Sequence, residues 1–254
     1  MAGANDEKSG KRVELEAIYA TLRDRICLLD YPPGTVLREA ELAQEFGISR
    51  TPIRTVLQRL AFGGLIESRD GVGTIVTSLS IGELRDIYEV RLRIAEMIGF
   101  LSPRPCSADQ VAAAAALSRR AERLTQRFDL IEYWRINHDL HFLIGDVIGN
   151  VALRQMWDYF YFQAARIWYA LAKENSEEVS SSLVNELAEV HRAMADGDMV
   201  AIGYIERNYI AFGLRMVSAA FAENRSLAPA AKTETTPRPA PVRSGRSAAR
   251  RRPG

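Results

Sequence analysis

The chain has 254 residues, of which 47 % are hydrophobic and 26 % are charged, and its formal net charge is +1. This composition is ordinary for a globular protein, and the length suits two domains of modest size. No stretch approaches the roughly 18 consecutive apolar residues that a membrane-spanning helix needs, and the polar residues 1–10 lack the apolar core of a secretory signal. Cys27 and Cys106 are the only cysteines. They encode neither a disulfide framework nor a cysteine zinc site, and they favour a reducing cytoplasm.

The N-terminal residues predict a leader and one helix. We expect residues 1–10 to be disordered, and we expect a helix over 13–29 because apolar side chains recur there at helical spacing. These side chains are Leu15, Ile18, Tyr19, Leu22, Ile26 and Leu29. Pro32 and Pro33 then stop the helix.

Two short helices and a hairpin are expected next. Residues 39–46 and 49–60 both show amphipathic spacing, and Gly47 with Ile48 supplies the tight turn between them. This spacing is typical of a helix-turn-helix. Short strands at 65–68 and 74–77, joined by a turn at 70–73, add a β-hairpin. The unit over 11–78 is therefore expected to be a winged helix-turn-helix.

The second of these helices carries a face of hydrogen-bond donors. Its apolar residues point one way, whereas Arg50, Thr51, Arg54, Thr55 and Gln58 fall on the other side. Between 46 and 66 the only ionisable side chains are Arg50, Arg54 and Arg59. Such a face is either an ordinary solvated surface or a DNA contact, and the winged context favours DNA. The expected DNA-binding residues are Arg38, Arg50, Thr51, Arg54, Thr55, Gln58 and Gly73.

These motifs resemble the N-terminal domain of GntR-type bacterial transcription regulators. The resemblance rests on Pro32-Pro33-Gly34-Thr35-Val36-Leu37-Arg38-Glu39, on Gly47-Ile48-Ser49-Arg50-Thr51-Pro52-Ile53-Arg54, and on Gly64-Leu65-Ile66 with Gly73-Thr74. It departs from the family at Thr55, where many members carry Glu. The resemblance implies a homodimer that binds an inverted repeat in double-stranded DNA.

The region 79–225 predicts an all-helical domain. Helical spacing runs over about 80–99, 107–124, 129–148, 151–173, 177–195 and 198–222, with no convincing strand. The chain as a whole is thus expected to be mostly α, with a C-terminal antiparallel helical bundle. In layout this region is similar to the FCD-type ligand-sensing domain of the FadR branch of the GntR family. The shared pieces are Asp86-Ile87-Tyr88-Glu89-Val90-Arg91, His141 before Gly149-Asn150, and Ala193-Met194 before Gly197-Asp198.

Many members of that branch hold a divalent metal with an Asp and three His. Carried over residue by residue, those positions fall on Asn137, His141, Leu187 and Tyr209. Only His141 is a strong ligand for a transition metal, so we expect no metal cofactor. A shifted site that pairs His141 with His191 or His138 stays open as an alternative.

Polar side chains inside a bundle need partners, because an unpaired buried polar group costs about 1–3 kcal/mol. We expect Arg91, Tyr133, Asn137, His141, Arg166 and Tyr209 to line one cavity, and the family resemblance favours an effector-binding pocket there. Arginines and a histidine suit a small organic anion, preferably a carboxylate. The alternative is a set of interhelical hydrogen bonds with no ligand.

The tail, 226–254, is basic and rich in Ala and Pro, and we expect it to be disordered. The chain shows no Gly-rich phosphate loop and no nucleophile elbow, so we expect no enzyme. An effector-free DNA-binding protein is the remaining alternative. The sequence therefore predicts a cytoplasmic, homodimeric DNA-binding transcription regulator whose affinity for its operator responds to a small molecule.

Overall fold

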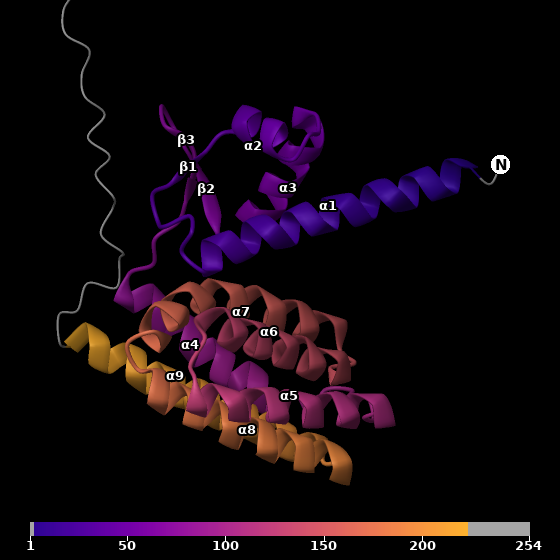
Figure 1. Ribbon diagram of the computed structural model, residues 1–254, viewed down its shortest axis with the longest axis vertical. Coiled ribbons are helices and arrows are strands. Elements are labelled where there is room, and N and C mark those ends of the chain that lie inside the picture. Colours follow the sequence, from indigo (N-terminus) through magenta and orange to yellow (C-terminus); the bar gives the residue numbers. More distant parts are fainter. Residues whose placement is uncertain (1–2, 223–254) are drawn as a thin grey trace, which may run out of the picture.

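Figure 1 shows the computed structural model, which describes residues 3–222, with side chains described from residue 14 onward. The N-terminal half contains α1 Gly3–Cys27, β1 Val36–Leu37, α2 Glu39–Glu45, α3 Arg50–Phe62, β2 Ile66–Arg69 and β3 Gly73–Val76. The C-terminal half contains α4 Ile81–Glu96, α5 Ala108–Gln126, α6 Leu130–Val147, α7 Val151–Ala172, α8 Ser176–Asp196 and α9 Met199–Ala222. The expected fold class, a mostly α chain with a winged helix-turn-helix before a helical bundle, is confirmed.

The wing is a three-stranded antiparallel sheet in the order β1-β3-β2. The hairpin of β2 and β3 matches the expected strands, whereas β1 was not expected. β1 has two residues, with Val36 paired to Ile75 and Leu37 to Thr74, and so short a strand leaves no alternating pattern in the sequence. Between α2 and α3, Gly47 adopts a φ of +67°, which a glycine allows without steric cost.

The first helix is longer than the sequence indicated. α1 begins at Gly3, so residues 3–10, which we expected to belong to a disordered leader, are helical. The segment contains no proline, and a glycine such as Gly10 costs only about 1 kcal/mol inside a helix. A helix that starts on the core residues Ile18 and Leu22 can therefore extend toward the N-terminus without a stop.

The helical bundle begins at two capping boxes. The backbone N–H of Ser80 donates to Glu83 Oε2 at 2.8 Å, and the Glu83 N–H donates back to Ser80 Oγ at 3.3 Å. Ser107 and Gln110 repeat this arrangement at the start of α5. Satisfied donors at both N-termini explain why these two helices start where the sequence predicts. In the bundle α4 packs on α7 and α9, and α5 packs on α6 and α8.

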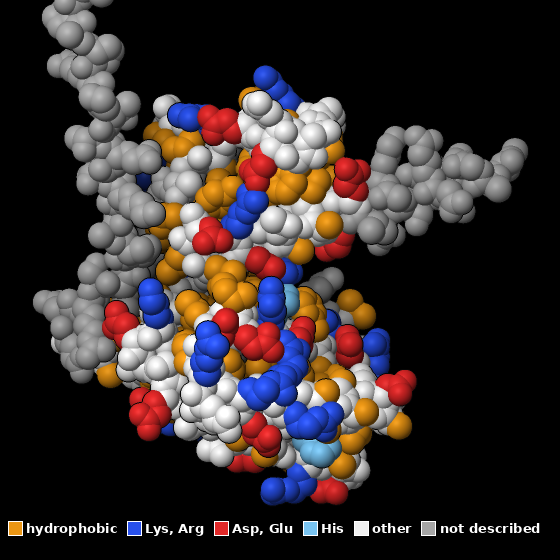
Figure 2. Space-filling view, viewed as in Figure 1, with side chains coloured by type: hydrophobic (Ala, Val, Ile, Leu, Met, Phe, Trp, Pro, Cys, Tyr) orange, Lys and Arg blue, Asp and Glu red, His pale blue; other side chains and the backbone are white. Residues whose placement is uncertain are grey.

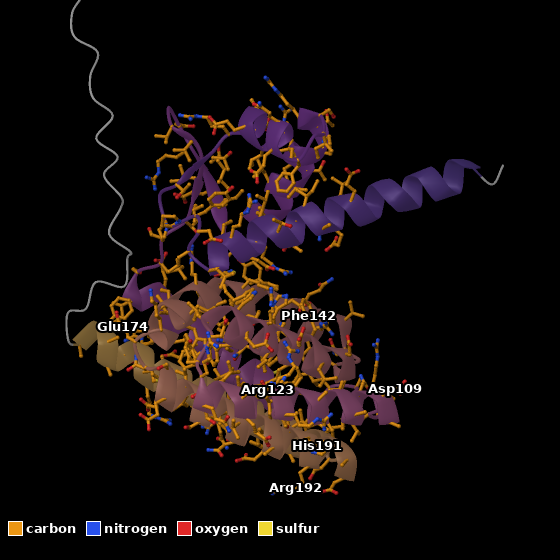
Figure 3. All side chains as sticks on the ribbon, in the orientation of Figure 1. Asp109, Arg123, Phe142, Glu174, His191 and Arg192 are labelled. Carbon is orange, nitrogen blue, oxygen red and sulfur yellow. The ribbon has the colours of Figure 1, made fainter. Side chains whose placement is uncertain are left out.

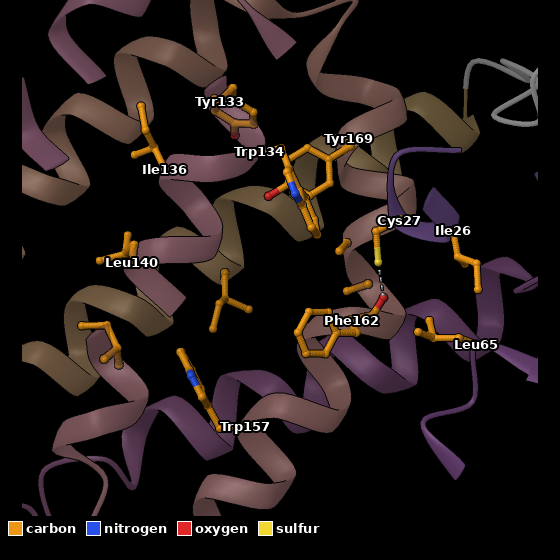
Figure 4. Packing of buried hydrophobic residues seen from close by; sticks show 14 of the residues in the cluster. Ile26, Cys27, Leu65, Tyr133, Trp134, Ile136, Leu140, Trp157, Phe162 and Tyr169 are labelled. Carbon is orange, nitrogen blue, oxygen red and sulfur yellow. Dashed lines mark hydrogen bonds between the residues drawn. The ribbon is translucent and has the colours of Figure 1, made fainter. Parts of the chain in front are cut away.

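A single hydrophobic core runs through both halves. α1 packs on α3 on one side and on α7 on the other, so its buried residues belong to the same cluster as those of the bundle. In Figure 4, Ile26, Cys27 and Leu65 of the N-terminal half lie on one side of Phe162. Tyr169 and Trp134 of the bundle lie on the other side. The Cys27 thiol donates to the backbone oxygen of Phe162 at 3.8 Å. The winged unit is thus packed directly against α7.

A short connection, residues 77–80, joins β3 to α4, and our domain limits at 11–78 and 79–225 remain predictions. The tail that we expected to be disordered, 226–254, lies outside the described residues. Among the described helices, none has the length and apolar character to cross a bilayer.

The crossing of α4 and α9 depends on Gly99. A Cβ added at Gly99 would lie 2.4 Å from Cα and 2.6 Å from N of Val200, which is closer than real contacts allow. We expect Gly99→Ala to lower the free energy of unfolding by about 1–3 kcal/mol, because a backbone must shift to make room. Gly82→Ala, where the added Cβ would meet no atom closer than 4.0 Å, is the control. Urea unfolding measures both, and a Gly99→Ala protein as stable as the wild type would contradict this account of the crossing.

Candidate functional site

The candidate DNA-binding residues all lie at the surface. Ile53, Val56 and Leu60 of α3 are buried, and they hold the opposite face of the helix outward. On that face Arg50, Thr51, Arg54, Thr55 and Gln58 are exposed. Arg38 is exposed at the N-cap of α2, and Gly73 is exposed at the start of β3 with a φ of +108°. A helix and a hairpin tip exposed side by side can address neighbouring grooves of DNA.

The charge on this surface differs from the sequence expectation. Arg54 donates from Nε and Nη2 to the two carboxylate oxygens of Glu39, both at 2.9 Å. Arg38 pairs with Glu41 at 2.9 Å, and Arg59 pairs with Glu16 at 2.8 Å. Figure 2 accordingly shows basic and acidic side chains next to each other on the winged unit. The face that seemed uniformly positive is therefore partly neutralised, because Glu39 and Glu16 reach it from other helices.

These ion pairs do not lock the surface. Arg54 is 62 % exposed and Arg38 is 68 % exposed, so water and salt screen both pairs. Arg50 forms no ion pair with any carboxylate of the described residues. A phosphate or a base edge can therefore compete for these guanidinium groups, which is consistent with a nucleic-acid contact.

A cavity lies inside the bundle, between α4, α6, α7, α8 and α9. Its volume of about 80 Å³ is several times the roughly 10–15 Å³ that a single water molecule needs. The structure brings Arg91, Tyr133, Asn137, His141 and Tyr209 together in its wall. The aromatic rings of Trp157, Tyr161 and Trp168 line the rest of it. Of the four carried-over positions, Asn137, His141 and Tyr209 line the cavity, whereas Leu187 does not.

Arg166 was wrongly assigned to this wall. It lies on the other face of α7, 2 % exposed, and donates from Nη1 to the backbone oxygen of Thr77 and, at 3.1 Å, to Thr77 Oγ1. Thr77 follows the last strand of the wing. The cavity therefore has one arginine rather than two, and Arg166 connects the bundle to the winged unit.

His141 is fixed in a neutral form. It is 3 % exposed, and its ring stacks on Tyr161 with centroids 3.8 Å apart. Burial lowers its pKa to about 4, against the opposing effect of Asp158, whose Oδ1 lies 2.8 Å from His141 Nε2. The neutral ring donates from Nε2 to that carboxylate, which leaves the lone pair of Nδ1 as a buried acceptor without a partner.

Other polar groups of the wall are already bonded to neighbouring residues. Asn137 donates to the backbone oxygen of Tyr133 at 2.8 Å, and Trp168 Nε1 donates to the Tyr133 hydroxyl at 2.9 Å. Tyr209 donates to Glu189 at 3.2 Å. The Trp168 and Tyr209 bonds join different helices, as in the hydrogen-bond network that was the alternative to a ligand site, whereas the Asn137 bond lies within α6. They hold the wall in place but account for only part of its polar atoms.

Two acidic residues of the cavity were missed from the sequence. Glu186 on α8 and Glu206 on α9 both line it. Glu206 is 5 % exposed, and its Oε1 has no hydrogen-bond partner. Burial raises the pKa of Glu206 to about 8, against the opposing effect of Arg91. Burial and the nearby Glu206 also hold the pKa of Glu186 well above its usual range. The available signal was the position of Glu206 between Ile202 and Ile210, on the buried face of α9.

The alternative metal site is not assembled. His191 does not line the cavity that contains His141, and Figure 3 places it on the outer helix α8, far from Phe142. His138 faces Arg23 instead, with its Nε2 2.9 Å from the guanidinium Nη2, and burial lowers its pKa to about 3. Within residues 3–222 no three potential ligand side chains come together. The donors present therefore do not fit a transition metal, which needs three or four.

The raised pKa of Glu206 predicts a pH-dependent stability. The unfolded carboxyl ionises at about pH 4.3, whereas the folded one keeps its proton up to about pH 8. Glu206 therefore lowers the free energy of unfolding of the wild type progressively as the pH rises through this window. We expect the stability of Glu206→Gln relative to the wild type to increase by roughly 2–5 kcal/mol between about pH 5 and about pH 8.

Urea unfolding at both pH values tests this expectation. Glu122→Gln, the same change at an exposed position of α5, is the control and should show no such trend. A difference between Glu206→Gln and wild type that stays constant with pH would contradict a carboxyl held protonated in the cavity.

Comparison with known proteins agrees with both parts of this architecture. Residues 15–76 match the family described as bacterial regulatory proteins, gntR family, and residues 86–211 match the FCD domain. Among solved structures, that of E. coli McbR/YncC is similar with a TM-score of 0.71 at 15 % identity, over 82 % of this chain and 98 % of that one. A putative GntR transcriptional regulator from Rhodococcus sp. RHA1 has a TM-score of 0.61 at 16 % identity, over 81 % of this chain and 98 % of that one. These identities support the fold alone.

Curated relatives match over shorter stretches. An uncharacterized HTH-type regulator of Agrobacterium vitis is 32 % identical over 37 % of this chain and 53 % of its own length. The probable D-xylose utilization operon transcriptional repressor of Paenarthrobacter nicotinovorans is 32 % identical over 38 % of this chain and 44 % of its own length. This chain thus spans about half the length of such relatives. All are transcription regulators and none is an enzyme. The chain therefore carries a GntR-type DNA-binding domain, which is followed by an FCD domain.

Proposed function

We propose that this protein is a homodimeric transcription regulator of the FadR branch of the GntR family, whose affinity for an inverted-repeat operator is modulated by a small organic anion. The observation that carries the proposal is the pairing of an outward-facing surface on α3 with a cavity in the bundle that is lined by charged, polar and aromatic side chains. A buried polar atom without a partner among the described residues, such as Glu206 Oε1, favours a ligand in the cavity over an effector-free DNA-binding protein. Because its target is chromosomal DNA, we place the protein in the cytoplasm.

In this proposal α3 lies in the major groove. Arg50 and Arg54 contact phosphates or base edges, Thr51, Thr55 and Gln58 assist them, and Arg38 adds a phosphate contact. Gly73, which carries no side chain, lets the backbone of the wing approach the minor groove. Glu39 accepts two hydrogen bonds from Arg54 in the free protein, so Arg54 must exchange these bonds for its contact with DNA.

A second copy of the chain supplies the other half of the operator contact. A groove between α4 and α7 is lined by Val90, Ile94, Met97, Leu153 and Met156, with Asp86, Glu89 and Arg93 at its rim. Met97 and Met156 are each 44 % exposed. An apolar centre with both signs of charge at its edge suits an isologous contact, in which Arg93 of one copy faces acids of the other.

Helix α7 offers a route from the cavity to the winged unit. Tyr161, Ala165 and Trp168 line the cavity. Their neighbours on the same helix, Phe162 and Arg166, contact Cys27 and Thr77 of the N-terminal half. A ligand that prefers one position of α7 would therefore also shift the position of the wing, through its differential affinity for two arrangements of the dimer.

The effector is expected to be a small carboxylate. Arg91 carries the only arginine guanidinium in the cavity wall, and it forms no ion pair with any described carboxylate. Its Cζ lies 5.2 Å from the ring centroid of Tyr88, which keeps the group against an aromatic face at the wall. An arginine without a salt bridge in an enclosed space is a strong partner for a carboxylate, because charge-assisted hydrogen bonds strengthen away from water.

Arg54→Ala tests the recognition surface. Loss of a bidentate contact should weaken operator binding by roughly tenfold or more at fixed salt. Arg123→Ala, an exposed arginine of α5 far from the winged unit, is the control and should leave affinity unchanged. The operator can be recovered by selecting bound fragments from the source genome, and fluorescence anisotropy gives the affinities. Equal operator affinity in Arg54→Ala and wild type would remove α3 from the interface.

Met156→Glu tests the dimer. A charge placed in the apolar centre of the groove should convert the protein to a monomer at micromolar concentration, since burying an unpaired carboxylate is costly. Ile131→Glu is the control, because Ile131 is 43 % exposed but lies on α6, outside the groove. Sedimentation velocity distinguishes the two states. A wild-type monomer, or a Met156→Glu dimer as stable as the wild type, would contradict pairing through α4 and α7.

A further inference from the structure

The cavity contains groups of both charge types. Arg91 projects from α4, whereas Glu186 and Glu206 come from α8 and α9. The positive charge of Arg91 lowers the pKa of His141, Glu186 and Glu206, so all three groups lie within its electrostatic reach. Even so, no carboxylate lies within 4.0 Å of its guanidinium in any described ion pair. The two kinds of group share one space without neutralising each other by direct contact.

Glu206 is a buried carboxyl group of the cavity wall whose hydrogen-bonding capacity is not fully used. It is 5 % exposed, and Oε1 has no hydrogen-bond partner among the residues that the structure describes. A buried carboxyl oxygen of this kind needs a hydrogen-bond partner, because an unsatisfied one costs about 1–3 kcal/mol. The other side chains of the wall do not supply it, since Tyr209 donates to Glu189 and Asn137 to Tyr133. His141 Nδ1 is a second buried acceptor without a donor.

We propose that the cavity binds a small zwitterion, an amino-acid-like molecule whose carboxylate contacts Arg91 and whose ammonium group contacts Glu206 and Glu186. This inference rests on the proposed effector role of the cavity and narrows the class of effector. An ammonium group has three donors, which meets the unpartnered oxygen of Glu206 and leaves donors for Glu186. Such a molecule carries one negative and one positive charge, which can pair with Arg91 and with the two glutamates of the cavity wall.

The neighbouring ligand classes fit less well. A simple cation would meet Arg91 at short range without a carboxylate of its own to offset the repulsion. A dicarboxylate would place its second charge against two carboxyl groups. A hydroxy acid could occupy the same positions, but its hydroxyl carries no charge to stabilise the ionised form of Glu206. An amino acid and its hydroxy counterpart therefore differ in the one group that the inference concerns.

The charge match has a consequence for pH. In the empty cavity burial raises the pKa of Glu206 to about 8, so binding an ammonium group near neutrality must release a proton. Affinity for the amino acid should then rise by up to about tenfold per pH unit between about pH 6 and about pH 8. Other titratable groups of the cavity wall do not change charge in this pH window. Burial lowers the pKa of His141 to about 4, and it raises the pKa of Tyr209 and of Tyr161 above the ordinary value of a tyrosine. Burial also raises the pKa of Glu186, so its ionisation on ligand binding contributes to the same pH dependence. Glu189 and Arg91 are the remaining charged groups near the site.

Matched pairs of small acids provide the test. Calorimetric titration of the full-length protein with alanine and lactate, serine and glycerate, and aspartate and malate compares an ammonium with a hydroxyl on the same skeleton. We expect at least one amino acid to bind at least about tenfold more tightly than its hydroxy counterpart, with the pH dependence given above. Glu206→Gln should lose this preference and its pH dependence, while Glu122→Gln on α5 should retain both.

Several results would overturn the inference: a hydroxy acid that binds as tightly as its amino acid, a preference that Glu206→Gln retains, or no binding of any probe to the wild type at millimolar concentration. Operator binding, measured in the same preparations without probes, separates this inference from the proposed function. Intact operator binding with no amino-acid preference contradicts the zwitterion alone. Failure of the wild-type protein to bind any selected operator contradicts the regulator itself.

Discussion

The arrangement of this protein depends on Arg166. Its guanidinium is buried between the bundle and the winged unit, where burial lowers its pKa, and it donates to both the backbone and the side-chain oxygen of Thr77. Within the described part of the chain, Nε and Nη2 of the same group have no hydrogen-bond partner. A buried charge with few hydrogen bonds is costly, so the contact contributes less to stability than to fixing where the wing sits on α7. It also gives α7 two tasks, because the opposite face of that helix is the wall of the cavity.

The cavity and the DNA-binding surface follow opposite physical rules. Near α3 the arginines are exposed, and their acidic partners hold them only loosely because water and salt screen each pair. In the bundle the charged groups are few, enclosed and incompletely paired, so each one has a large effect on what can bind. DNA binding is therefore expected to use many contacts and to weaken as the salt concentration rises. Ligand contact is expected to be selective and sensitive to protonation.

The sequence predicted what depends on local spacing. The helix limits followed from caps such as Ser80 with Glu83, and His141 and Asn137 were correctly placed in one wall because residues four apart share a helix face. The features that the sequence did not predict depend on which other element each helix face packs against. α7 is buried on several sides, so spacing alone did not show that Arg166 faces the wing rather than the cavity. The pairing of Arg54 with Glu39 joins two helices across a turn, and acids such as Glu206 usually face water, so neither was visible in the pattern.

The central claim is that the cavity and the operator site are coupled through α7. The most direct test measures the affinity for a selected operator with and without the small-molecule fraction of a cell extract from the source organism, in the wild type and in Arg91→Ala. We predict that the extract changes the wild-type affinity several-fold, and that the ratio between the two conditions falls to one in Arg91→Ala. The same ratio in both proteins, or no effect of the extract on either, would contradict the claim.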